Sequence, residues 1–348
     1  MVSVDPRDAS AVAEVLRRRA ADRFGTATVA EAPSSIGAGF DSYIHVVRLA
    51  GPGLPDEWRA PLVVRLLPSV DRTTQAREEA AAQAWSRSLG YPAPRVLEVL
   101  GPDEGFGLPA QVMERAPGVT MLDALSRRPW RALALVDQLA TLQLQLHALP
   151  TDTWPGPTDP RALADKRLGL PRRAARALGD PALAAALDRA EAVVPDGLTG
   201  VPVVCHGDFH PLNVVVDGDR AAVIDWTDAG MGPREADVAR TNLLFRVASI
   251  AATGSVERLA LRLAGPRLQG RYRRAYERRH PLDRRRMLVW EALHALHGWA
   301  QVATLHAGGF DGESSSAGEP ARAPIELAGW LRGRFEAALD ALRGCHTP

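Results

Sequence analysis

Lysine is almost absent from this chain: Lys166 is the only lysine among 42 Lys plus Arg residues. Any role that needs a cation must therefore fall almost entirely to arginine. Cysteine is equally scarce, because Cys205 and Cys345 are the only two and they lie far apart, outside any paired motif. This excludes a disulfide framework and gives no sign of a zinc site, and it fits a reducing compartment such as the cytoplasm.

Long apolar runs and an excess of charge are also missing. No stretch approaches the roughly 18 apolar residues that a membrane span requires, and the N-terminal segment has no apolar core behind a basic start, so neither a membrane partner nor export is expected. The net charge is only +1. The arginine runs at 17–19 and 284–286 fall in helical patterns, so we interpret them as solvated helix faces and expect no nucleic-acid partner.

The composition is that of a soluble globular protein, with 46% hydrophobic and 24% charged residues in a chain of 348. This length favours two lobes. We expect an N-terminal lobe over residues 1–115 that contains most of the β-structure, and a C-terminal lobe over residues 116–348 that is mainly helical. The chain shows no internal repeat.

Hydrophobic periodicity predicts the elements of both lobes. In the first lobe, a leading helix at 8–24 precedes a five-stranded antiparallel sheet with strands at 28–31, 43–49, 62–67, 96–100 and 110–114, and a helix at 77–89. In the second lobe, helices are predicted at 121–125, 130–149, 181–194, 234–252, 256–263, 268–279, 284–306 and 325–343. Short strands are predicted at 203–205, 214–216 and 222–224, and a Gly/Ser/Pro-rich loop at 308–324.

The most informative stretch is VVCHGDFHPLNVVVDGDRAAVID, which ends at Asp225. Phosphoryl transfer needs metal ions on the phosphates and a carboxylate near the acceptor hydroxyl. Asp208 follows a strand and a glycine, which makes it the candidate general base. Asn213 and Asp225 carry the oxygen ligands that Mg²⁺ prefers. The hairpin between them is expected to bring these two side chains together.

The histidines of this stretch have alternative interpretations. His206 is expected to hold the loop by hydrogen bonds, whereas His210 either donates to a phosphate or faces solvent. Together with Asp208 they could also suggest a metal-dependent hydrolase. Such a site needs further ligands from other strands, and no second histidine cluster stands in a suitable place. We expect Cys205 to be a core residue.

The motif HGDFHPLN followed by IDW resembles the aminoglycoside phosphotransferase and choline kinase-like family, relatives of the protein kinases. The resemblance extends over most of the chain and implies an α+β, bilobal protein kinase-like fold, with the nucleotide bound by the N-terminal lobe. It implies a kinase that uses ATP or GTP with Mg²⁺ to phosphorylate a hydroxyl of a small molecule. Asp208 would be the base, and Asn213 and Asp225 would be the metal ligands.

The resemblance also assigns the nucleotide-binding residues. Gly37 and Gly39 would lie in a phosphate-covering turn over residues 34–40. Glu114 and Ala116 would present the backbone hinge for the purine. On the third strand, the usual lysine is replaced by Arg65, which keeps the positive charge for the phosphates.

The partner of Arg65 and the activity of the site are left open by the sequence. Glu79 is the candidate ion-pair partner, and Glu78 is the rival. The competing function is a nucleotide-binding regulator of pseudokinase type. The resemblance further implies a structural role for Asp237.

The acceptor is less well defined. Asp228, Trp290, Glu291 and His294 could line a pocket for a bulky, partly apolar alcohol such as a macrolide or nucleoside antibiotic, or a small metabolite alcohol. The alternative is that the aromatic stripe at 290–299 packs on the last helix. From residue 240 onward there are 17 Arg against 10 Asp plus Glu, which argues against polycationic aminoglycosides. A monomer and a homodimer are equally compatible with the sequence.

Overall fold

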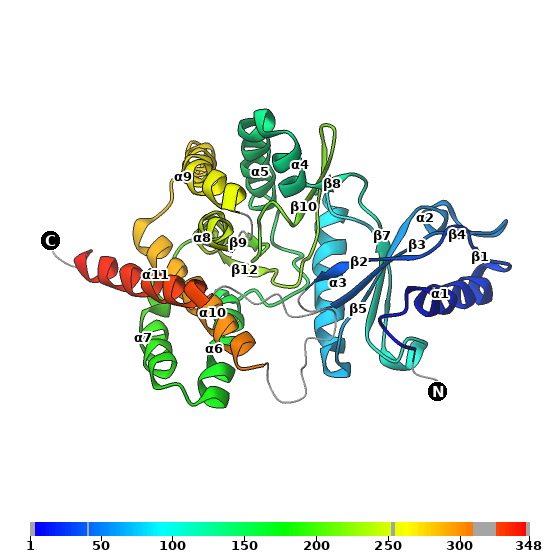
Figure 1. The fold of residues 1–348 in the computed structure, drawn as a ribbon, viewed down its shortest axis with the longest axis horizontal. Helices are drawn as coiled ribbons and strands as arrows, with labels where there is room; N and C mark the ends of the chain where they lie inside the picture. The colour runs from blue at the N-terminus through cyan, green and yellow to red at the C-terminus, as the bar shows by residue number, and fades with distance from the viewer. Residues whose placement is uncertain (1–3, 40–41, 252–254, 309–324, 346–348) are drawn as a thin grey trace. The chain divides into compact units, whose positions relative to one another are not determined.

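The computed structural model describes residues 4–39, 42–251, 255–308 and 325–345 (Figure 1). The chain divides into two compact units. The sheet unit comprises the described residues up to Pro117 together with Ala222–Thr227, and the helical unit comprises the rest.

The sheet unit contains the predicted five-stranded antiparallel sheet, in the order β2-β3-β5-β7-β6. Its strands are β2 (Ser34–Gly39), β3 (Ser42–Val47), β5 (Leu62–Leu66), β6 (Val96–Leu100) and β7 (Ala110–Glu114). The prediction of its first strand was wrong, because β1 (Thr28–Val29) pairs only with β4 (Leu49–Ala50) in a separate two-stranded sheet. The edge strand is instead β2, whose small residues suggested a turn but which pairs with β3. Pairing with the apolar strand β3 here outweighs the low strand propensity of the β2 residues.

Helices complete the sheet unit. The leading helix α1 (Ala9–Phe24) begins at its N-cap Asp8, whose carboxylate accepts from the backbone of Ser10 and Ala11, as an N-cap side chain does. Its buried face belongs to the same apolar core as strands β3, β5 and β7. The remaining helical segments are α2 (Asp56–Arg59), η1 (Val70–Arg72), α3 (Thr73–Ser88) and η2 (Pro102–Glu104).

The helical unit is built around α10 (Arg284–His306), whose bounds match the prediction. This helix packs against α6 (Pro160–Leu178), α7 (Pro181–Gly197), α8 (Arg234–Ala251) and α11 (Ile325–Gly344). The other helical segments are α4 (Met121–Arg127), η3 (Pro129–Arg131), α5 (Ala132–Leu146) and α9 (Ser255–Glu277). None of the helices in the described residues is long and apolar enough to cross a membrane.

Short strands connect the helices and flank the polar residues of the stretch that ends at Asp225. They are β8 (Val119–Thr120), β9 (Pro202–Cys205), β10 (Val214–Asp217), β11 (Arg220–Val223) and β12 (Gly230–Pro233). They form a three-stranded sheet in the order β11-β10-β8 and a pair of β9 with β12. The strands at 203–205, 214–216 and 222–224 were predicted to within two residues, whereas β8 and β12 were not predicted.

Two helix predictions need correction. Helix α6 was missed, although Asp159 caps it and Pro160 occupies its first turn, which is a regular helix start. Helix α9 is one helix rather than two, because the chain continues helically through Pro266. The loop predicted at 308–324 lies outside the described residues apart from Gly308.

Candidate active site

In the sheet unit, Arg65 on β5 is the centre of a buried polar cluster. Its guanidinium pairs with Glu79 of α3 and donates through Nε to Ser42 Oγ at 3.0 Å. Its Nη2 donates to Thr227 Oγ1 at 3.1 Å. The open choice of partner is thereby decided for Glu79, since Glu78 is exposed. The helical period explains this, because two neighbouring residues cannot face the same side of α3.

Glu79 is only 3% exposed, and its Oε2 has no hydrogen-bond partner. Burial raises the pKa of Glu79, even though the positive charge of Arg65 beside it acts to lower it. Arg65 therefore stays charged, whereas burial disfavours the charged form of Glu79. Any group that approached Arg65 would compete with Glu79 for the same guanidinium.

Asp225 follows β11 in a strained backbone conformation, with φ at +62°, the only positive φ of a non-glycine residue among those described. Two neighbours hold this segment in the sheet unit. Val223 donates its backbone N–H to Pro92 O at 2.7 Å, and Trp226 is buried with an edge contact to Tyr91. The strain is thus supported by packing on both sides of the aspartate.

The Asp225 carboxylate is also oriented by Thr227. The Thr227 hydroxyl donates to Asp225 Oδ1 at 2.7 Å while it accepts from Arg65 Nη2. Arg65 Nη1 lies 3.6 Å from the same Oδ1. Arg65 therefore fixes Asp225 both directly and through Thr227, which the sequence did not indicate.

The other predicted nucleotide-binding residues occupy defined places in the sheet unit. Glu114 is the last residue of β7, and Ala116 lies three residues beyond Met113, outside any element. In the described residues the Ala116 N–H has no backbone acceptor, and the hinge role of Glu114 and Ala116 stays a prediction. Gly37 and Gly39 lie within β2 rather than in the predicted turn, at a point where the pairing with β3 shifts register.

In the helical unit, the loop that carries Asp208 leaves β9 and is fastened to Asp237 at the start of α8. The Asp237 carboxylate accepts the backbone N–H of Gly207 at 2.7 Å and that of His206 at 3.1 Å, and His147 Nε2 lies 3.1 Å from it. Burial would raise the pKa of Asp237, but the bonds to His147 and its other partners lower it. Asp237 thus has the structural role expected for it.

Gly207 can only be glycine in this loop. Its φ is +79°, and a Cβ at this position would lie 2.3 Å from the carbonyl oxygen of Asp228. The turn and the close backbone approach together place the next residue, Asp208, at the surface of the loop. His206 is fully buried, and its Nδ1 lies 3.3 Å from the Asp208 backbone nitrogen, which fits the predicted loop-holding role.

Both oxygens of the Asp208 carboxylate have partners. Arg240 of α8 approaches Oδ1 with Nε and Nη2, each at 2.9 Å. Oδ2 lies 3.1 Å from His210 Nε2 and 3.3 Å from Asn213 Nδ2. Burial would raise the pKa of Asp208, but Arg240, with help from His210, holds it well below the usual range of a carboxyl group.

Asn213 is oriented by its amide nitrogen, which donates to the Asp208 backbone oxygen at 2.9 Å. Within the described residues no donor reaches its Oδ1, so the amide oxygen is the atom left for a ligand. A neutral amide oxygen and the Asp225 carboxylate are a donor set that fits Mg²⁺. Asn213 belongs to the helical unit and Asp225 to the sheet unit, so their convergence on one ion stays a prediction. The part of the chain that is described holds no group of three or more His, Cys, Asp and Glu side chains placed to bind a metal.

Two functional candidates were missed by the sequence analysis. Arg240 is the first. The second is Arg167 of α6, which is 1% exposed and donates through Nη2 to both Gly207 O and Asp228 Oδ2 at 2.7 Å. Burial would raise the pKa of Asp228, but Arg167 lowers it. Asp228 was predicted to contact the acceptor, and the structure places it in an ion pair with Arg167.

The other predicted acceptor residues lie on α10, where Trp290 and His294 are buried and Glu291 is partly exposed. Trp290 is fully buried and donates to Gly197 O at 2.9 Å, and His294 is 2% exposed with Nε2 2.8 Å from Ala236 O. Glu291 pairs with Arg334 of α11. The structure thus gives Trp290 and His294 the packing role that was the alternative, because neither presents surface to a ligand.

Comparison with known proteins supplies the family. Residues 46–288 match the model of the phosphotransferase enzyme family, and this range includes Arg65, Glu79, Asp208 and Asp225. The chain belongs to this phosphotransferase family. An aminoglycoside 3'-phosphotransferase of Streptomyces fradiae is 33% identical over 177 residues, which are 46% of this chain and 61% of that protein. The chain therefore spans about three fifths of the length of this curated relative.

Solved structures of the phosphotransferase family share the fold. A thermostable mutant of aminoglycoside phosphotransferase APH(4)-Ia, in a ternary complex with AMP-PNP and hygromycin B, aligns over 95% of this chain and 99% of its own, with a TM-score of 0.60 and 19% identity. A Plasmodium vivax ethanolamine kinase aligns over 95% of this chain and 86% of its own, with a TM-score of 0.54 and 14% identity. The predicted kinase-like fold, with a sheet lobe and a helical lobe, is confirmed.

Proposed function

We propose that this protein transfers the γ-phosphoryl group of ATP or GTP to a hydroxyl group of a small molecule. The observation that carries the proposal is the Asp208 carboxylate, which Arg240, His210 and Asn213 hold in one orientation and in its ionised form. A fixed carboxylate beside the acceptor hydroxyl is the group that this reaction needs from the protein.

The lowered pKa of Asp208 suits a loose transition state. When the bond to the leaving phosphate is largely broken before the new bond forms, the acceptor hydroxyl needs little help from a strong base. Asp208 would then orient the hydroxyl and take its proton late in the step. Asn213 Oδ1 and Asp225 would hold Mg²⁺, which supplies positive charge to the phosphate oxygens.

The Arg65 cluster supports a nucleotide site in the sheet unit. Arg65 would supply the cation for the phosphates, and the Ala116 N–H with the Glu114 carbonyl would bind the purine edge. Gly37 and Gly39 would cover the phosphates, and His210 would donate to one of them. The structural relative in complex with AMP-PNP supports nucleotide use by a chain of this fold.

For the acceptor, we propose a neutral or partly apolar alcohol, macrolide-like or nucleoside, rather than a polycation. The relatives are named for aminoglycosides and ethanolamine, which are amines. In this chain, however, Asp228 is already paired with Arg167, and Arg240 adds a further positive charge beside Asp208. An ammonium group would find both carboxylates already paired with arginines, which lowers the attraction it could gain there.

The test is to incubate the protein with Mg²⁺, ATP or GTP, and a panel of a macrolide, a nucleoside, an aminoglycoside and ethanolamine, and to search each product by mass spectrometry for one added phosphate. We expect a product with a neutral alcohol, and none with the variant Asp208→Ala, which should still bind nucleotide. A product only with the aminoglycoside would overturn the acceptor proposal but not the reaction.

A nucleotide-binding regulator is the second candidate, because Arg65 stands where the family resemblance implies a lysine and a phosphate would have to compete with Glu79 for its guanidinium. Binding of nucleotide with no turnover against any acceptor, and no difference between the wild type and Asp208→Ala, would favour this alternative.

A further inference from the structure

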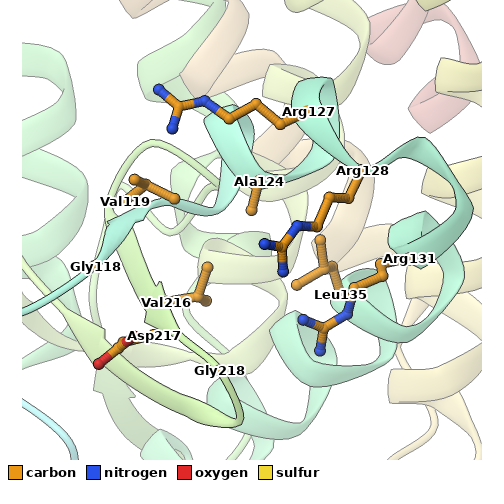
Figure 2. A pocket seen from close by; sticks show the side chains of 10 residues that line it. All are labelled: Gly118, Val119, Ala124, Arg127, Arg128, Arg131, Leu135, Val216, Asp217 and Gly218. Carbon is orange, nitrogen blue, oxygen red and sulfur yellow. The ribbon is translucent and has the colours of Figure 1, made fainter.

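A cavity of about 250 Å³ lies in the helical unit, outside the clusters described above (Figure 2). It is formed where α4 and η3 face the hairpin of β10 and β11. Its apolar side chains are Val119, Ala124, Leu135 and Val216, and its rim includes the arginines 127, 128 and 131. Gly118 and Gly218 complete the wall, so the backbone is accessible at two points.

Positive charge dominates this cavity. Figure 2 shows the guanidinium groups of Arg128 and Arg131 directed into the hollow, whereas the carboxylate of Asp217 points away from them. Arg131 has one weak ion pair, 3.8 Å from the fully exposed Asp219. Among the described residues no carboxylate lies within salt-bridge distance of Arg127 or Arg128. Cations gathered around one hollow repel each other, and a bound anion would relieve this repulsion.

The cavity is separate from the catalytic loop. Successive side chains of a strand point to opposite faces, so Val216 faces the cavity while Val215, its neighbour on β10, faces the other side. The lining also contains neither Asp208 nor Asn213. A ligand here would not need to displace the acceptor.

We propose that this cavity binds a small phosphomonoester, with its phosphate on Arg128 and Arg131 and its organic group on the apolar floor. Guanidinium groups bind phosphate oxygens through paired N–H donors, and two arginines match the charge of a phosphomonoester near neutral pH. The volume is below the range of about 300–1,000 Å³ that is usual for drug-sized ligands. It therefore suits a compact molecule such as phenyl phosphate rather than a nucleoside triphosphate.

The test uses phenyl phosphate as probe, titrated into the full chain by calorimetry at constant ionic strength, with Mg²⁺ and AMP-PNP present at saturation. We expect one site, with inorganic phosphate bound about ten-fold more weakly because it has no apolar group to bury. Arg128→Ala should weaken phenyl phosphate about ten-fold or more, the effect of losing one charged hydrogen-bonding group.

Two further variants make the result decisive. Ala124→Leu fills the floor and keeps every charge, and it should weaken binding about ten-fold as well. Arg220→Ala is the matched control, because Arg220 is an exposed arginine on β11 that does not line the cavity, and it should change the affinity by less than about two-fold. The proposal is overturned if phenyl phosphate does not bind, if Arg220→Ala costs as much as Arg128→Ala, or if Ala124→Leu has no effect.

Discussion

Replacing Arg240 by alanine tests whether this arginine keeps Asp208 ready for the reaction. Arg240 touches the candidate base rather than a substrate, so we regard it as a positioning residue. Its side chain is 12% exposed, and both contacts to Asp208 are 2.9 Å long. Without it, the contacts of Asp208 Oδ2 to His210 and Asn213 remain, but Oδ1 loses its partner.

The size of the effect follows from these contacts. A hydrogen bond to a charged group contributes about 1.5–3 kcal/mol, and each 1.4 kcal/mol changes a rate about ten-fold. We therefore expect kcat to fall by about 10- to 100-fold in Arg240→Ala, with KM for the nucleotide nearly unchanged. Burial, which Arg240 now overcomes, should then raise the pKa of Asp208.

The assay is a pH profile of kcat for the wild type, Arg240→Ala and Arg240→Lys. The wild type should show no acid limb from Asp208 above about pH 5, because its pKa lies below the ordinary value of about 3.9. In Arg240→Ala an acid limb should move up into the measured range. Arg240→Lys keeps the charge but loses the two-pronged contact, so it should lower kcat without moving the limb as far.

Stability gives an independent readout of the same pair. The lowered pKa of Asp208 stabilises the folded state above the carboxyl group's ordinary pKa, and this stabilisation is lost as the pH falls through the folded-state pKa. Arg240→Ala should therefore lower Tm at pH 7 and approach the wild type near pH 3. An Arg240→Ala protein with the kcat, the pH profile and the Tm of the wild type would refute this role of Arg240.

Three further variants probe the other contacts. Thr227→Val removes the hydroxyl that orients Asp225 and should raise the Mg²⁺ concentration for half-maximal activity about five- to ten-fold at nearly constant Tm; an unchanged magnesium titration would exclude this role. Gly207→Ala forces a Cβ against the Asp228 carbonyl oxygen and should cost about 2–4 kcal/mol in urea unfolding, whereas a wild-type midpoint would mean that the loop relaxes freely. Burial, with nearby arginines, lowers the pKa of His297 to about 4, so unfolding free energy should drop by about 2 kcal/mol from pH 7 to pH 5. In His297→Gln the unfolding free energy should therefore fall less between pH 7 and pH 5 than in the wild type. An equal fall in both proteins would contradict this role of His297.

The sequence predicted the elements whose own periodicity is strong. Helix α10 has a continuous pattern and an Asp283 cap, and its predicted bounds match the structure. Strand β2 was missed as a strand because Ser34–Gly39 has the composition of a turn, and only its partner β3 makes it a strand. Helix α9 was divided because Pro266 is a strong local breaker, although the helix continues through it.

The part of the site that the residues themselves predicted lies in one short motif. Asp208, Asn213 and Asp225 stand in one stretch whose spacing indicates their chemistry. Arg240 lies on α8, three residues after Asp237, so the helical period puts both on one face toward the loop, and this signal could have been used. Arg167 could not be found, because its helix was not recognised and its partners Gly207 and Asp228 are distant in sequence.

The scarcity of lysine has a structural counterpart in these contacts. Arg65 joins Glu79, Ser42 and Thr227, and Arg167 joins Gly207 O to Asp228.

Arg65 uses Nε, Nη1 and Nη2 of one planar head to fix three partners at once, which the single ammonium of lysine cannot reproduce in the same geometry. Arg167 makes both of its bonds through Nη2. Because a guanidinium does not lose its proton in a protein, it also stays charged when buried, whereas a buried lysine becomes neutral more readily. A lysine at position 167 carries enough donors for Gly207 O and Asp228, but it places them on a flexible stem with a compact head of different shape. We expect Arg167→Lys to weaken both contacts and damage the catalytic loop although the formal charge is kept.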